Sequence, residues 1–243
     1  MDYRDHLTKT YHKGYFKGRR DLRASRIEKT VLLLGKVLGK VILDLGCGTG
    51  EGSILLRNSG ADVICVDITR YAVDTCHKEG FSGVVAAAHC LPFKNSLFAG
   101  ILFMDVIEHI PRKLVRQTLE EMKRILKSDG RIAVHTMPNL FLEKLSILYG
   151  MINRKHWRQW GESGGHVNTY TAWKLKKDIG IARLEIVRFD IGSYPLDAPF
   201  ATIGLLLSRL TAKFFGNDFW ICCKVPRAKR EDCAHDQSTH KRI

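Results

Sequence analysis

The pattern of apolar and polar positions divides the chain into short apolar runs that alternate with amphipathic segments. Apolar or β-branched runs predict strands at residues 41–45, 62–67, 83–87, 98–104, 131–135, 183–191 and 219–225. Apolar positions at helical spacing predict helices over 53–59, 70–79, 111–126 and 171–179. Such alternation is typical of right-handed βαβ units. We therefore predict an α/β fold with a mostly parallel sheet that helices cover on both faces.

The flanking segments predict the organisation of the chain around this domain. Apolar residues at 27, 31, 34 and 38 predict a helix that ends near Gly39. A loosely ordered arm over residues 1–26 is predicted to precede it. Residues 1–40 would thus form a basic arm and helix. The domain is expected over 41–225. The alternation breaks at about 139–166, which predicts a lid or acceptor-binding insertion beside the carboxyl ends of the strands. Residues 226–243 are polar and predicted to be disordered. In the helix over 111–126, Glu120 is placed to pair with Arg124.

The stretch VILDLGCGTG (residues 41–50) carries the first sign of function. An apolar strand runs into glycines at 46, 48 and 50, and a helix follows, which predicts a backbone cradle for a small ligand. A dinucleotide fingerprint would need glycine at position 51, where Glu51 stands. Asp67 ends the next predicted strand, where a carboxylate can accept both hydroxyls of a ribose. The alternative role of Asp67 is the N-cap of the next helix, which Thr69 could also supply.

Composition narrows the choice of partners only partly. The chain has 39 Lys and Arg against 25 Asp and Glu, a formal charge of +14, which favours nucleic acid, phospholipid or a phosphorylated substrate, or simply solvated basic surfaces. Seven cysteines without a C-x-x-C pair indicate a reduced intracellular protein and no metal site. The polar first residues and the shortness of the longest apolar run, 198–207, predict a cytoplasmic protein without a signal peptide.

Several motifs together resemble those of class I S-adenosylmethionine-dependent methyltransferases. They are LDLGCGTG, Asp67 at the end of the next strand, LPF (91–93), VIEHI (106–110), RILKSDGRI (124–132) and MPN (137–139). The resemblance covers roughly residues 40–140 and is greatest to the subgroup that includes quinone, sterol and glycan or lipid methyltransferases. It implies a Rossmann-like seven-stranded sheet with a lid insertion after the fifth strand and S-adenosyl-L-methionine as cofactor. The implied reaction is methyl transfer to oxygen or carbon of a small-molecule, lipid-linked or glycan acceptor.

The resemblance also implies roles for individual residues. The cofactor-binding residues that it implies are Asp44, Gly46, Cys47, Gly48 and Gly50 for the methionine portion, Asp67 for the ribose, Ile68, Ala88 and His89 around the adenine, and Met104, Asp105 and Val106 beneath the reactive methyl. Two positions depart from the usual pattern. Ala87 stands where relatives carry an acid that accepts the adenine amino group, so His89 or backbone would take that hydrogen bond, or the cofactor would bind more weakly. Ala99 stands where an acid often follows the aromatic residue.

The catalytic and acceptor-binding candidates carry more alternatives. His109 and His166 are candidate bases, and for each a purely structural role is an equal alternative. Phe141, Trp157 and Trp160 in the insertion line an acceptor pocket or close a core. The apolar segments 140–152 and 200–210 are core helices or, with the basic residues at 154, 155 and 158, contacts with an anionic membrane.

Two other functions stay open. An RNA or other nucleic-acid methyltransferase is supported mainly by charge, and the chain lacks the N/D-P-P-Y/F box and the Pro-Cys pair of two base-methylating classes. A non-catalytic cofactor-binding protein is the second alternative, for which Ala87 is the hint.

Overall fold

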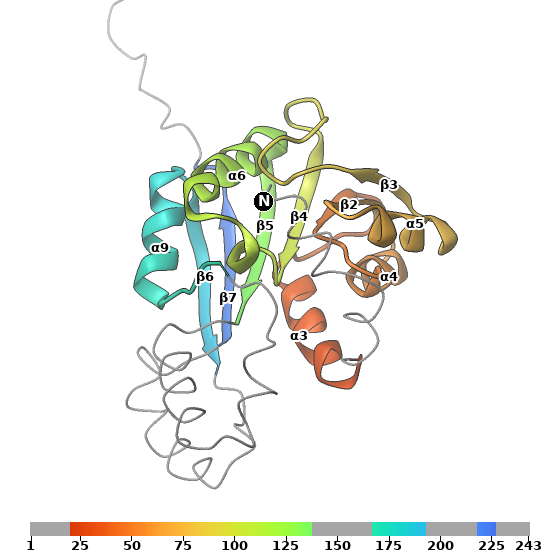
Figure 1. Cartoon of the computed structure of the whole chain (residues 1–243), viewed down its shortest axis with the longest axis horizontal. Helices are drawn as coiled ribbons and strands as arrows, with labels where there is room; N and C mark the ends of the chain where they lie inside the picture. The colour runs from red at the N-terminus through yellow and green to blue at the C-terminus, as the bar shows by residue number, and fades with distance from the viewer. Residues whose placement is uncertain (1–19, 138–166, 193–217, 227–243) are drawn as a thin grey trace, which may run out of the picture.

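The computed structural model describes residues 20–137, 167–192 and 218–226, which contain a seven-stranded sheet (Figure 1). Its strands are β1 (Val41–Leu45), β2 (Asp62–Asp67), β3 (Ser82–Val85), β4 (Phe98–Met104), β5 (Leu126–Thr136), β6 (Glu185–Gly192) and β7 (Asp218–Lys224). Their order is β3-β2-β1-β4-β5-β7-β6. The first five strands pair in parallel, while β7 lies antiparallel between β5 and β6. The predicted mostly parallel α/β fold is confirmed.

Helices cover both faces of this sheet, as the sequence predicts. One face packs against α3 (Arg20–Leu32), α4 (Glu51–Asn58) and α5 (Arg70–Lys78), and the other against α6 (Arg112–Ile125) and α9 (Ala172–Ile181) (Figure 1). A short 3₁₀ helix, η1 (Ile107–His109), follows β4. Because the central strands bury both faces, they consist of continuous apolar runs such as FAGILFM in β4.

The first described helix differs from its prediction at both ends. It begins at Arg20, within the segment predicted as a loose arm, because arginine, leucine and alanine all favour helix there. It ends at Leu32 and not near Gly39. Gly35 adopts a φ of 73°, which takes the chain out of helical conformation. The predicted apolar stripe therefore ends early, and Leu38 is 64% exposed.

The predicted partner of Arg124 is wrong. Arg124 Nε donates to Glu121 at 2.7 Å, and Glu120 instead pairs with Arg116 at 2.8 Å. The guanidinium of Arg124 also donates to the backbone carbonyls of Leu91 and Phe93, at 3.0 and 2.7 Å. Glu121 also accepts the N–H of Leu91 at 3.0 Å, so the acid three residues before Arg124 binds the same loop. Arg124 thus fixes the LPF loop that replaces a helix between β3 and β4.

One further boundary differs from its prediction, and several predicted segments lie outside the described residues. β5 begins at Leu126, so the KSDG segment belongs to an irregular start of this strand, where its register with β4 shifts. The predicted insertion at 139–166 with its aromatic residues, the apolar segment 200–210 and residues 227–243 lie outside the described residues. None of the described helices is both long and apolar enough to cross a bilayer.

Candidate functional site

The turn after β1 has the conformation that its glycines predict. Gly46, Gly48 and Gly50 have φ angles of 81°, 54° and 89°, a region that residues with a Cβ enter at a cost. The N–H of Gly46 donates to the carbonyl of Val66 on β2 at 2.7 Å, which fixes the turn against the neighbouring strand. A Cβ on Gly46 would lie 2.2 Å from Val106 Cγ2. The turn is therefore held close to the segment after β4, and only glycine fits.

Asp67 links this turn to β2 and α5. Its Oδ2 accepts the N–H of Gly48 at 3.1 Å, and its Oδ1 accepts both the N–H and the hydroxyl of Thr69 at 2.8 Å. Thr69 in turn caps α5 by accepting the N–H of Ala72 at 3.4 Å. The N-cap role thus belongs to Thr69, and Asp67 faces the pocket. Burial raises the pKa of Asp67 even though these hydrogen bonds favour its ionised form.

Asp44, near the carboxyl end of β1, is only 4% exposed. Its Oδ2 accepts the hydroxyl of Ser53 at 2.6 Å, and α4 packs so closely that a Cβ on Gly52 would lie 3.1 Å from the same oxygen. Burial raises the pKa of Asp44 to about 7. A cationic group that entered the pocket would compensate this carboxylate and return its pKa toward the ordinary value.

The edge predicted for adenine consists of small side chains and backbone. Ala86, Ala87 and His89 line the pocket there, and Ala87 pairs with Cys90 through an isolated antiparallel bridge. The N–H of Ala86 donates to the carbonyl of Asp67 at 3.0 Å, and the N–H of Cys90 donates to the carbonyl of Ala87 at 2.9 Å. Within this edge, His89 is the only side chain that can hydrogen-bond to a ligand.

A buried charge network lies behind the opposite end of the pocket. Asp105 follows β4 with a φ of 54°, and its Oδ1 lies 2.6 Å from Nδ1 of His135 on β5. Nε2 of the same histidine lies 3.4 Å from Oδ1 of Asp218 on β7. His135 is fully buried and its ring packs against Trp220 at 4.9 Å between centroids. Burial lowers its pKa, but the two carboxylates outweigh burial and raise it to about 9. The two carboxylates thus favour the protonated form of His135, and its Nδ1 contact holds Asp105 in place.

Glu108 joins η1 to residues 167–168. Its side chain is 2% exposed and accepts the hydroxyl of Thr136 at 3.0 Å. Its backbone carbonyl accepts the N–H groups of Val167 and Asn168 at 3.0 and 2.9 Å, and the amide of Asn168 donates to the carbonyl of Ile110. Burial and the charge of Asp105 raise the pKa of Glu108 to about 8. The VIEHI segment and residues 167–168 are thereby fixed to each other.

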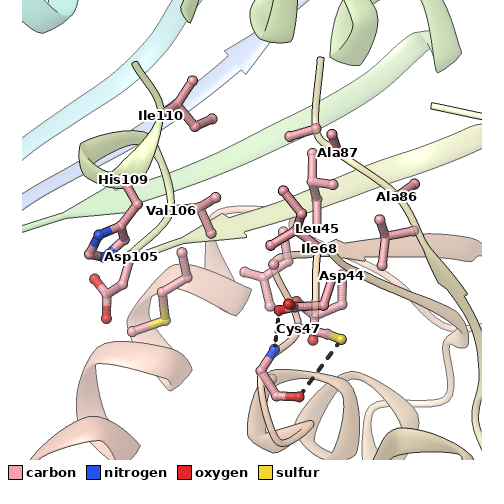
Figure 2. A pocket seen from close by; sticks show the side chains of 18 of the residues that line it. Asp44, Leu45, Cys47, Ile68, Ala86, Ala87, Asp105, Val106, His109 and Ile110 are labelled. Carbon is pink, nitrogen blue, oxygen red and sulfur yellow. Dashed lines mark hydrogen bonds between the residues drawn. The ribbon is translucent and has the colours of Figure 1, made fainter. Parts of the chain in front are cut away.

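The glycine turn, Asp44, Asp67, the alanine edge and Asp105 surround one pocket (Figure 2). Figure 2 shows His109 and Asp105 together at one side, Ala86 and Ala87 at the opposite side, and Asp44 and Cys47 between them. The predicted site residues that line it are Asp44, Gly46, Cys47, Gly48, Asp67, Ile68, Ala88, His89, Met104, Asp105, Val106 and His109. Four carboxylates, those of Asp44, Glu51, Asp67 and Asp105, line it, whereas no lysine or arginine of the described residues does.

The other site predictions have different outcomes. Gly50 is outside the pocket lining and is the N-cap of α4, whereas His166 lies outside the described residues. Sequence reasoning missed Ile27, which brings α3 to the pocket, and it missed His135 and Asp218 behind it. His135 is a polar residue at the end of an apolar run and Asp218 directly precedes such a run, and no local pattern pairs either of them with Asp105.

Known proteins resemble both the sequence and the fold. Residues 43–134 match the family model described as a methyltransferase domain. This match supports a class I S-adenosylmethionine-dependent methyltransferase domain over these residues. An uncharacterized protein of Methanocaldococcus jannaschii is 33% identical over 141 residues, 58% of this chain and 52% of that protein. The malonyl-[acyl-carrier protein] O-methyltransferase of Herminiimonas arsenicoxydans is 28% identical over 124 residues, 50% of this chain and 46% of the relative.

A third relative has a different kind of acceptor in its name. The tRNA (carboxymethyluridine(34)-5-O)-methyltransferase of Arabidopsis thaliana is 28% identical over 134 residues, 54% of this chain and 32% of the relative. The chain thus spans about half, or less, of the length of these relatives.

Solved structures of methyltransferases share the fold at low sequence identity. One, from a complex with the Trm112 methyltransferase activator of Haloferax volcanii, has a TM-score of 0.69 at 18% identity and covers 91% of this chain and 98% of its own. Magnesium protoporphyrin IX methyltransferase of Synechocystis with bound S-adenosylhomocysteine has a TM-score of 0.64 at 15% identity and covers 93% and 100%. The matched methyltransferase domain supports S-adenosylmethionine as the cofactor.

Proposed function

We propose that this chain transfers the methyl group of S-adenosylmethionine to an oxygen or carbon of a small-molecule, lipid-linked or glycan acceptor. The observation that carries the proposal is an acidic pocket, built on a glycine turn, in a chain of formal charge +14. A sulfonium and an α-ammonium group carry positive charge, which the four carboxylates favour, whereas the phosphates of a dinucleotide would be repelled.

The residues present fit this cofactor. The glycine turn, which lies close to Val106, leaves its part of the pocket floor without bulky side chains, so that the methionine portion could lie directly against the backbone. Asp67 has carboxylate lone pairs beyond those used by Gly48 and Thr69 and would accept the ribose hydroxyls. Adenine would lie against Ile68 and the alanines of the opposite edge, where His89 or backbone groups would take the hydrogen bond that an acid makes in relatives.

Bound S-adenosylmethionine would supply an already electrophilic methyl group, so the chain has chiefly to align the acceptor. Alignment contributes up to about 7–11 kcal/mol in favourable cases. Asp105 would accept a hydrogen bond from an acceptor hydroxyl, because imidazolium His135 fixes its carboxylate and lowers its basicity. His109, at the same side of the pocket, would remove the acceptor's proton, which adds about 10²- to 10⁴-fold where that proton is weakly acidic.

A nucleic-acid acceptor is the second candidate, supported by the net charge of +14 and by the relative named as a tRNA methyltransferase. Against it, the charged side chains that line the described pocket are acidic and would disfavour a polyphosphate backbone near the methyl group. A protein that binds the cofactor without catalysis is the third candidate. The small-molecule acceptor is therefore preferred.

Two measurements test the proposal in sequence. Isothermal titration with S-adenosylmethionine and S-adenosylhomocysteine should show stoichiometric binding, and no heat at millimolar ligand would refute the cofactor assignment. Next, methyl transfer from methyl-labelled cofactor is followed into lipid, polar-metabolite and RNA extracts. Label in the lipid or metabolite fraction that is lost in Asp67→Ala supports the proposal, label confined to RNA supports the second candidate, and binding without transfer to any fraction supports the third.

A further inference from the structure

Three cysteines that are far apart in the sequence meet beneath the glycine turn. Cys47 lies in the turn itself, Cys65 on β2 and Cys76 on α5, and all three are buried. Their Sγ atoms all lie within 4.8 Å of one another, and Cys76 Sγ is 3.6 Å from Cys47 Sγ. All three are free thiols. We propose that Cys47, Cys65 and Cys76 form a binding site for a single thiophilic d¹⁰ cation of the Zn²⁺ class.

The spacing of the sulfur atoms suits such a cation without rearrangement of the fold. With metal–sulfur bonds of about 2.3 Å, tetrahedral thiolates lie about 3.8 Å from one another. The distance of 3.6 Å between the Sγ atoms of Cys47 and Cys76 and the upper bound of 4.8 Å for all three Sγ pairs bracket this value. A cation placed among the three sulfurs would thus need only sub-ångström adjustments of side chains on a strand, a helix and a fixed turn.

The surroundings supply further donors and a route of entry. The carbonyl oxygen of Gly48 lies 3.9 Å from Cys47 Sγ and 3.8 Å from Cys76 Sγ, where it can become a fourth ligand. The hydroxyl of Ser53 lies 3.1 Å from Cys65 Sγ and donates to Asp44, so it links one ligand to a buried acid. Cys47 lines the pocket and opens the cluster to it. On binding, each thiol loses its proton to solvent as its sulfur bonds the cation.

Occupation of this site would act on the cofactor pocket, an effect that rests on the proposed function. Cys47 and Gly48 belong both to the cluster and to the glycine turn, and Gly48 donates its N–H to Asp67. A cation that draws the Gly48 carbonyl toward the cluster would tilt the peptide between Gly48 and Thr49 and thereby disturb the adjoining N–H of Gly48, which donates to Asp67. Cation and cofactor would then weaken each other's binding by the same factor.

The test titrates the reduced full chain with Cd²⁺, a spectroscopically visible probe for this cation class, in a Cys90→Ser/Cys233→Ser background without added reductant and under argon. Thiolate-to-cadmium absorption should saturate at a single equivalent. Cys65→Ala and Cys76→Ala each remove a direct ligand and should weaken binding by at least about 10- to 100-fold, the loss that follows removal of a residue that only supports a ligand. Cys223→Ala, a buried cysteine on β7 outside the cluster, is the matched control and should bind like the background protein. Substoichiometric binding, or equal affinity in all variants, would overturn the site.

A second measurement needs no variant in the cluster. Alkylation in mild denaturant, read by mass spectrometry, should show Cd²⁺ protecting Cys47, Cys65 and Cys76 together while Cys223 is labelled at an unchanged rate. Loss of the mass of two hydrogens would mean that a disulfide has formed, which overturns the cation site. S-adenosylhomocysteine affinity is then compared with and without Cd²⁺. Binding of S-adenosylhomocysteine to the metal-free chain tests the proposed function. The absorption titration with Cd²⁺ tests the cation site in the absence of cofactor.

Discussion

Gly46→Ala is the perturbation whose effect the structure determines most directly. Alanine at a φ of 81° costs about 1–2 kcal/mol because of its left-handed conformation. The added Cβ would lie 2.2 Å from Val106 Cγ2, so either the turn or the segment after β4 must move. Such overpacking adds about 1–3 kcal/mol. We therefore expect the free energy of unfolding to fall by about 2–5 kcal/mol in total.

Gly80→Ala separates the two contributions. Gly80 follows α5 with a φ of 80°, but a Cβ there would meet no heavy atom within 4 Å. It should therefore lose only the conformational part, about 1–2 kcal/mol. Urea denaturation followed by circular dichroism measures both variants. Adding Val106→Ala to Gly46→Ala should recover part of the loss, since it removes the overlapping methyl group. Equal destabilisation by the two glycine substitutions, with no recovery, would refute the close approach of the turn to Val106.

Further predictions concern the cofactor, pH and catalysis. Asp67→Ala should weaken S-adenosylhomocysteine binding by about tenfold or more because it removes the ribose acceptor and the anchor of the turn, whereas exposed Asp62→Ala should not; equal affinities in calorimetry would contradict the role. The ligand-free chain should lose stability as the pH rises toward 9. In the folded chain the pKa of Asp44 is raised from 3.8 to about 7, so Asp44 stays protonated longer than in the unfolded chain and stability falls as the pH rises through this range. The pKa of His135 is raised from 6.5 to about 9, so its contribution to stability is complete below pH 6.5 and is lost as the pH rises past about 9. Asp44→Asn should flatten the acid half of this slope in urea titrations, and a stability that rises with pH would contradict the assignment. His109→Gln should lower kcat about 10²-fold or more while cofactor affinity stays near wild type, and an unchanged kcat would leave His109 a structural role.

Much of the fold and of the cofactor side of the pocket could be predicted from local sequence. The bounds of β2 and β4 match their predictions, because buried parallel strands are continuous apolar runs. The glycine turn and Thr69 as helix cap follow from the conformations and hydrogen bonds of single residues. The apolar spacing wrongly predicted the end of the first helix. The spacing continues in sequence past Gly35, but the backbone leaves the helical conformation there.

What the sequence by itself determined is therefore the order of strands and helices and the glycine turn with its acid at position 67, since each depends on contacts among neighbours along the chain. Only the tertiary structure decided which distant side chains share a site. It places Asp218 of the antiparallel β7 behind His135, and it brings Cys47, Cys65 and Cys76 within reach of one cation. The physical reason is that strand order and helix packing, which arise from burial summed over the whole core, bring together residues that no local pattern relates.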